Sequence, residues 1–144
     1  MRALGLNFRA SPPRLGALTH LHAINFVRLL SERQAPGVEW TSQRLLQAEQ
    51  PKRTPGLDLP HLPDARALYQ DKHYAIEVEL TAKSQARLLR ILQELIQTYD
   101  VVHYYVSAEA NQAVNQALSH FAEDEQKKVR IALLEHYGYS IRRG

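Results

Sequence analysis

The feature that most constrains this chain is a strand–helix–strand succession between residues 73 and 106. Segments 73–80 (HYAIEVEL) and 101–106 (VVHYYV) are rich in β-branched and aromatic residues, which is typical of strands. Between them, apolar residues recur with helical spacing after Ser84, which predicts an amphipathic helix capped by that serine. Strands that are joined through a helix belong to an α/β sheet. The predicted inward positions of the helix are Leu88, Leu89, Ile91, Leu92, Leu95, Ile96 and Tyr99.

The rest of the chain predicts a mixed β-sheet flanked by helices. Apolar spacing, helix caps and prolines set the other elements. The first is a helix that is capped by Thr19 and runs to about Ser31, in a unit that Pro36-Gly37 ends. An extended piece at 38–40, a helical turn that starts at Thr41 or Ser42, and a proline-rich loop at 51–63 follow. The chain then forms a hairpin of strands 64–70 and 73–80 and, beyond the elements described above, a helix capped by Ser107 and a last strand at 129–134.

Composition restricts the class of protein. A length of 144 residues with 44% apolar and 23% charged side chains suits a globular protein with one domain, which we place at residues 18–144 after a loosely ordered arm at residues 1–17. No apolar run approaches the roughly 20 residues that span a bilayer, which excludes an integral membrane protein. The lack of cysteine excludes disulfide scaffolds and cysteine zinc sites, and it fits a cytoplasmic location.

The charges are unevenly distributed along the chain. Residues 1–60 carry eight cations and four anions, whereas residues 61–100 carry five cations and six anions. This pattern suits either a phosphate-binding face beside a carboxylate site or an ordinary solvated surface. The net charge of +3 alone favours the solvated surface.

The hairpin brings acidic residues together. If Asp71-Lys72 forms a two-residue turn, Asp64 lies opposite Glu79, and Glu77 lies on the same face of the sheet. A loop of odd length would shift the pairing by one residue and separate these side chains. Ile76, Val78 and Leu80 point to the other face.

Three converging carboxylates suggest a metal site. Their mutual repulsion is relieved by a hard divalent cation such as Mg²⁺ or Mn²⁺, which carboxylates and phosphate oxygens both ligate. We therefore take Asp64, Glu77 and Glu79 as candidate metal ligands and Lys83 as a candidate catalytic cation that stabilises charge on a phosphate. The alternative is a solvated Glu-x-Glu strand that Lys83 balances at the surface.

Other polar and aromatic residues favour structural roles. The seven histidines show no metal-binding spacing, and we expect His20 and His22 to be structural, which leaves His61, in the loop before Asp64, as the histidine of interest. Glu32 is either a fourth acid of the site or an exposed residue at a helix end. We expect at least one of Tyr104 and Tyr105, together with Trp40, in the core.

The spacing Pro63-Asp64, twelve residues, and then Glu77-Val78-Glu79 resembles the PD-(D/E)XK nuclease superfamily. The wider run LPDARALYQDKHYAIEVELTAKSQARLLRIL, followed by VVHYYV, resembles the replication-relaxation family of plasmids and mobile elements. Upstream, Val38-Glu39-Trp40-Thr41-Ser42 and Arg44 are also similar to that family.

The resemblance implies a restriction-endonuclease-like fold and DNA as the partner. It implies that Asp64 and Glu77 hold the metal and that Glu79, where the superfamily usually has lysine, is a ligand or general base, with Lys83 as a relocated lysine. Family members usually begin with a winged-helix segment, whereas only residues 1–17 precede the first predicted helix here. We therefore expect DNA targeting to come from a separate targeting or mobilisation protein, or to have been lost by truncation.

Three functions remain open from the sequence. The first is a metal-dependent DNA phosphodiesterase or nickase that acts in plasmid or mobile-element replication or mobilisation. The second is a catalytically inactive DNA-binding or regulatory module with the same fold. The third is a protein–protein adaptor in which the carboxylates form a surface patch.

Overall fold

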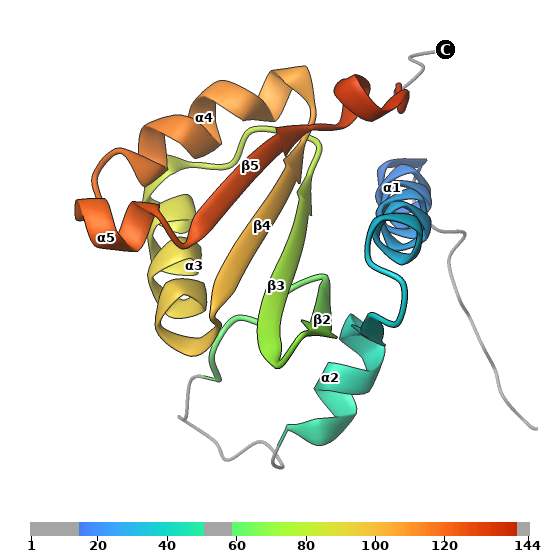
Figure 1. Ribbon diagram of the computed structural model, residues 1–144. Coiled ribbons are helices and arrows are strands. Elements are labelled where there is room, and N and C mark those ends of the chain that lie inside the picture. Colours follow the sequence, from blue (N-terminus) through green and yellow to red (C-terminus); the bar gives the residue numbers. More distant parts are fainter. Residues whose placement is uncertain (1–14, 51–58, 141–144) are drawn as a thin grey trace, which may run out of the picture.

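A five-stranded mixed sheet runs through the middle of the fold, with helices on both faces (Figure 1). The computed structural model describes residues 15–50 and 59–140. The strands lie in the order β1 (Glu39–Ser42), β2 (Ala65–Tyr69), β3 (Lys72–Glu79), β4 (Val101–Val106) and β5 (Val129–Leu133). Neighbours from β1 to β3 are antiparallel, and neighbours from β3 to β5 are parallel. The predicted mixed α/β sheet is confirmed.

The helices divide the core into two layers. α1 (Leu15–Gln34) covers one face of the sheet, and α3 (Gln85–Thr98) and α4 (Ala108–Leu118) cover the other (Figure 1). The core on the α3 side includes Leu92 and Val102, and the core on the α1 side includes Val27, Ile76 and Val78. The shorter helices are α2 (Gln43–Glu49), α5 (Glu123–Gln126) and the 3₁₀ helix η2 (Leu134–Tyr137).

Serine caps fix the starts of the helices that follow strands. The side-chain oxygens of three serines each accept a hydrogen bond from the backbone N–H three residues later, which satisfies a donor that the first helical turn leaves unpaired. These serines are Ser42, Ser84 and Ser107. Ser107 also donates a 2.7 Å hydrogen bond to the carbonyl of Leu80, which ties the end of β3 to the start of α4. These three caps agree with the sequence-based expectation.

Two predictions about the N-terminal part were wrong in detail. α1 begins at Leu15, so Thr19 lies inside the helix rather than at its cap, and residues 15–17 do not belong to an arm. The rest of the predicted arm lies outside the described residues, as does most of the 51–63 loop. The short helices α5 and η2 carry no long apolar period and were not predicted.

The hairpin between β2 and β3 turns one residue earlier than predicted. Tyr69 pairs with Lys72, so Gln70 and Asp71 form the turn, with positive φ angles of 51° and 65°. Two successive residues with positive φ are characteristic of a type I′ turn, whose twist matches the flanking strands. The same register pairs Ala65 with Ile76 and, continued by one residue, places Asp64 opposite Glu77 rather than Glu79.

None of the helices in the described part of the chain combines the length and apolar character needed to cross a bilayer.

Candidate functional site

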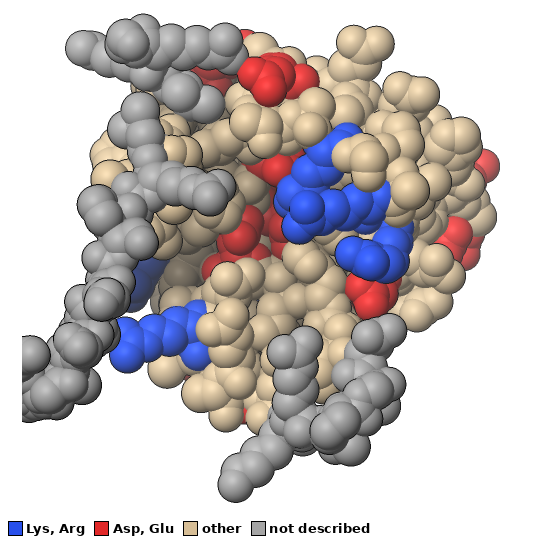
Figure 2. Space-filling model, turned by 180° about the vertical axis from the view of Figure 1, so that it is seen from behind, with Lys and Arg blue, Asp and Glu red and all other residues tan. Residues whose placement is uncertain are grey.

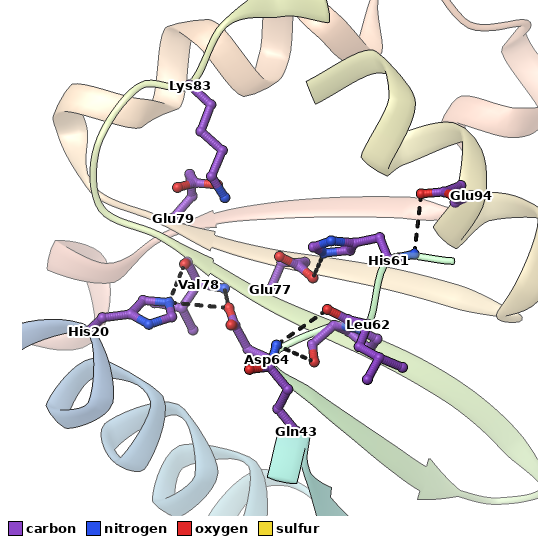
Figure 3. A network of polar contacts seen from close by, with 11 residues as sticks. His20, Gln43, His61, Leu62, Asp64, Glu77, Val78, Glu79, Lys83 and Glu94 are labelled. Atoms are coloured by element: carbon purple, nitrogen blue, oxygen red, sulfur yellow. Dashed lines mark hydrogen bonds and ion pairs between the residues drawn. The ribbon is translucent and has the colours of Figure 1, made fainter. Parts of the chain in front are cut away.

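Asp64 lies at the entrance to β2, where three elements meet. Its backbone carbonyl accepts a 3.2 Å hydrogen bond from the N–H of Gln43, the first residue of α2. The Gln43 side chain donates to the carbonyls of Leu62 and Pro63, which holds the preceding segment in place (Figure 3). The start of α2 thus fixes the backbone that presents Asp64.

The Asp64 carboxylate accepts a hydrogen bond from the backbone of β3 just before β2 begins. Its Oδ2 accepts a 2.8 Å hydrogen bond from the N–H of Val78 and lies 3.4 Å from Nε2 of His20 on α1. The same His20 nitrogen donates to the carbonyl of Val78 at 3.0 Å. The bond to Asp64 raises the pKa of His20 above its ordinary value, against the opposing effect of burial. The Asp64 carboxylate is therefore held between the backbone of β3 and α1, the helix that covers the face opposite to α3.

Glu77 and Glu79 are the two charged residues in the buried part of the described structure, with exposed fractions of 3% and 5%. They alternate with Ile76 and Val78 along β3 and therefore point to the α3 side of the sheet. A carboxylate in such a position loses its hydration and needs a partner. Each one has a different partner.

Glu77 is held by His61. Their Oε2 and Nε2 atoms share a 3.0 Å hydrogen bond, and the backbone N–H of His61 donates to Glu94 of α3 (Figure 3). Burial raises the pKa of Glu77 to about 7, with a further rise from the Asp64 charge and opposing effects from His61 and Lys83. Asp64 thus lies close enough for its charge to act on Glu77.

Glu79 is held by Lys83. The Lys83 ammonium lies 2.7 Å from Oε2 of Glu79 and comes from the loop between β3 and α3 (Figure 3). This side chain is half-buried and follows its partner by four residues, as the sequence suggested. Glu77 is therefore paired with a residue that precedes β3 in the chain, His61, and Glu79 with a residue that follows β3, Lys83.

Tyr104 lies beside the acids on β4. It pairs with Glu77 in the parallel β3–β4 register, is fully buried, and has a hydroxyl without a hydrogen-bond partner among the described residues. Burial raises its pKa, and the charges of Glu77, Glu79 and Asp64 raise it further. Buried polar groups are normally hydrogen-bonded, so this hydroxyl is a feature of the site that its packing does not explain.

The charge pattern of the surface is mixed on this side of the molecule. Figure 2 shows acidic side chains within a hollow and basic side chains beside it, on the face opposite to the view in Figure 1. Acidic and basic side chains therefore lie next to one another on this face.

The structure pairs Glu77 with His61 and Glu79 with Lys83, whereas the Asp64 carboxylate contacts His20 of α1. It also adds His20, Gln43, Glu94 and Tyr104 to their surroundings. We expected a structural role for His20 but not its contact with Asp64, because that contact depends on how α1 crosses the sheet. Glu32 lies apart from the site and pairs with Arg28 at 3.3 Å on the exposed side of α1.

Residues 15–50 and 59–140 contain no group of three or more His, Asp or Glu side chains that could hold a metal ion in this arrangement. The donor set still has the chemistry that a hard divalent cation requires, since it consists of carboxylate oxygens. The three acids Asp64, Glu77 and Glu79 each have a different partner, namely His20, His61 and Lys83. Binding a cation would thus require the side chains to move closer together.

No protein-family model matches the chain, and neither does any curated protein.

Proposed function

We propose that this chain is a metal-dependent DNA phosphodiesterase or nickase of the replication-relaxation type, with a restriction-endonuclease-like fold. The order of β1 to β4, an antiparallel meander followed by a helix and a parallel strand, is compatible with that fold. Pro63-Asp64 precedes β2, and Glu77 and Glu79 lie on β3, which fits the strand positions of the PD-(D/E)XK pattern.

The observation that carries the proposal is the burial of Glu77 and Glu79 beside Asp64. Buried ionic groups are often replaceable by apolar side chains without loss of stability, so structure alone gives little reason to keep two of them on one strand. Perturbed pKa values from burial and charged neighbours cluster at functional sites. Glu77 has this combination of burial and charged neighbours.

The proposed roles follow from the contacts. Asp64, Glu77 and Glu79 would hold Mg²⁺ or Mn²⁺, which when bound polarises a phosphodiester and lowers the pKa of a water ligand. Lys83 lies where its ammonium neutralises Glu79 and can stabilise negative charge that develops on a phosphate. His61 positions Glu77, and the buried Tyr104 hydroxyl offers a hydrogen-bond donor beside the acids.

A plasmid-nicking assay tests this function. Supercoiled plasmid is incubated with wild-type protein and Mn²⁺ or Mg²⁺, and conversion to the open-circular form is measured. We expect wild type and the exposed control Glu49→Gln to nick equally, and Glu77→Gln to lose at least about 100-fold in rate. The enzymatic proposal fails if wild type and Glu77→Gln leave the plasmid equally intact.

A second candidate is a catalytically inactive DNA-binding or regulatory module with the same fold. It is favoured by the partners that the acids already have, since Asp64, Glu77 and Glu79 contact His20, His61 and Lys83. It predicts DNA binding that weakens as salt rises, without cleavage, which fluorescence anisotropy with a labelled duplex measures. An absence of binding at low salt contradicts this candidate.

A further inference from the structure

α3 has one side that packs against α4 and another that lies toward the acidic residues of β3. On the first side, Gln85 donates a 2.9 Å hydrogen bond to the carbonyl of Ala113 on α4. On the other side, the Glu94 carboxylate accepts a hydrogen bond from the backbone N–H of His61. The side of α3 that carries Glu94 therefore borders the residue that holds Glu77.

Arg87 and Arg90 lie on the same side of α3 as Glu94. The three positions are separated by three and four residues, a spacing that places side chains next to one another along a helix. Lys83, which contacts Glu79 at 2.7 Å, lies just before the helix begins. Basic groups therefore follow one another along α3 from the end of β3, and Figure 2 shows basic side chains beside an acidic hollow.

The two arginines are available to an external anion. Both are exposed, and neither side chain forms an ion pair or a hydrogen bond with a described residue. Arg28 and Arg66, in contrast, have the carboxylates of Glu32 and Glu49 as partners. A guanidinium group can bind phosphate oxygens through two parallel hydrogen bonds. The arginine pair thus offers two adjacent phosphate-binding groups beside the acids.

We propose that Arg87 and Arg90 bind successive phosphates of a DNA strand, so that α3 guides the strand toward Glu77 and Glu79. The choice of DNA as the partner rests on the proposed function, and the inference adds which residues hold the strand. The two arginines are spaced by about 4.5 Å along the helix axis, and successive phosphates of one strand advance by about 3.4 Å along a duplex. Long arginine side chains accommodate this difference.

The salt dependence of DNA binding tests the proposal without relying on cleavage. Fluorescence anisotropy with a labelled duplex, in the presence of EDTA, gives the binding constant between about 50 and about 200 mM salt. We expect Arg87→Gln and Arg90→Gln each to reduce the slope of log K against log salt by about 1, because each removes one phosphate contact. The double variant should reduce the slope by about 2 and weaken binding at low salt at least about tenfold.

Two control variants separate a phosphate contact from a change in the fold. Arg33→Gln removes an exposed arginine from α1, on the opposite face of the sheet, and should keep the wild-type slope. Arg87→Lys retains the positive charge and should restore most of the slope that Arg87→Gln loses. A wild-type slope in both glutamine variants of α3, or an equal reduction by Arg33→Gln, overturns the proposal.

The plasmid-nicking assay separates this proposal from the proposed function. If wild type nicks plasmid, the double variant should raise KM at least about tenfold, whereas Glu77→Gln should lower the rate at saturating plasmid. Nicking by wild type together with an unchanged salt slope in the double variant overturns the role of the arginines alone. A reduced slope in the double variant without nicking by wild type supports that role and overturns the phosphodiesterase function. Absence of DNA binding by wild type at low salt overturns both.

Discussion

The most informative single residue is Glu77, which is buried, acidic and held by a histidine. Its environment raises its pKa to about 7, so the charged form is poorly stabilised at neutral pH. A neutral side chain of the same shape should therefore be tolerated by the fold even where it removes function. Separation of stability from function is a typical property of active-site residues.

We predict that Glu77→Gln leaves the free energy of unfolding at pH 7.5 unchanged within about 1 kcal/mol or raises it. The amide keeps the volume of the glutamate and removes the cost of burying its charge. Urea unfolding followed by circular dichroism measures this. The adjacent Val78→Ala is the control and should lose about 2 kcal/mol, because it leaves a cavity in the α1-side core. A loss from Glu77→Gln as large as that from Val78→Ala contradicts the prediction.

His103 gives a pH dependence that is separate from the acidic site. It stacks on Tyr105 with ring centroids 4.2 Å apart and lines a cavity of about 210 Å³ between the sheet and the end of α1. Burial, with a smaller effect from the Arg130 charge, lowers the pKa of His103 to about 4. In the unfolded chain this side chain takes up a proton near pH 6.5.

Because its pKa is lowered by folding, His103 should make the protein less stable as pH falls. The unfolded state binds a proton below about pH 6.5 that the folded state refuses until about pH 4, which costs at most about 3 kcal/mol. His103→Phe keeps a ring against Tyr105 and should lose this part of the acid sensitivity. Urea unfolding between pH 7.5 and 4 should show it, with His120→Gln, at an exposed position, retaining the wild-type pH profile.

The residue scale also shows where sequence reasoning ended. The pattern Pro63-Asp64 with Glu77 and Glu79 was readable because strand alternation and hairpin pairing are local regularities. The contact of His20 with Asp64 joins α1 to the far end of the hairpin region, and its sequence separation leaves no periodic signal. The partners of the acids were therefore less predictable than the acids.

At the scale of elements, Ser107 combines two functions that Ser84 does not. Both cap a helix, but Ser107 also donates to the carbonyl of Leu80 and is partly buried. We predict that Ser84→Ala costs about 1 kcal/mol and Ser107→Ala about 2 kcal/mol of unfolding free energy, since the second variant also leaves a carbonyl unpaired. Urea denaturation of the two variants provides the comparison. Equal losses would show that the bond to Leu80 contributes nothing.

The hairpin shows what element-level prediction can and cannot supply. Strand positions followed from β-branched and aromatic residues, but the turn residues Gln70 and Asp71 lack the glycine that usually marks positive φ. The predicted turn was therefore displaced by one residue, which shifts the pairing by two. A shift of two preserves which side of the sheet each strand residue faces, so Glu77 and Glu79 keep their side while the residue opposite Asp64 changes from Glu79 to Glu77. Asp64 itself precedes β2, and its carboxylate contacts His20 of α1.

At the scale of the whole molecule, one sheet serves two cores. Leu92 belongs to the α3-side core, and Trp40, the one tryptophan of the chain, packs against the α1-side core. A small domain whose layers share a sheet should unfold as one cooperative unit. Tryptophan fluorescence can therefore report on damage to the opposite layer.

We predict that Leu92→Ala lowers the free energy of unfolding by about 2 to 5 kcal/mol, since it removes fully buried methyl groups. The Trp40 fluorescence transition in urea should shift together with the far-ultraviolet circular dichroism transition. The exposed Leu45→Ala should shift neither by more than about 0.5 kcal/mol. A Leu92→Ala variant with an unchanged fluorescence midpoint would mean that the two layers unfold independently.

The tight turn at Gln70-Asp71 also restricts how such a gene can change. Adding or deleting one residue there would shift the pairing of β2 with β3 by one, so that the side chains of β3 would face the opposite sides of the sheet relative to those of β2. Either Ile76 and Val78 or the carboxylates of Glu77 and Glu79 would then lie on the wrong side. Descendants that keep both layers can vary the length of this hairpin only by two codons at a time, or by compensating changes in both strands.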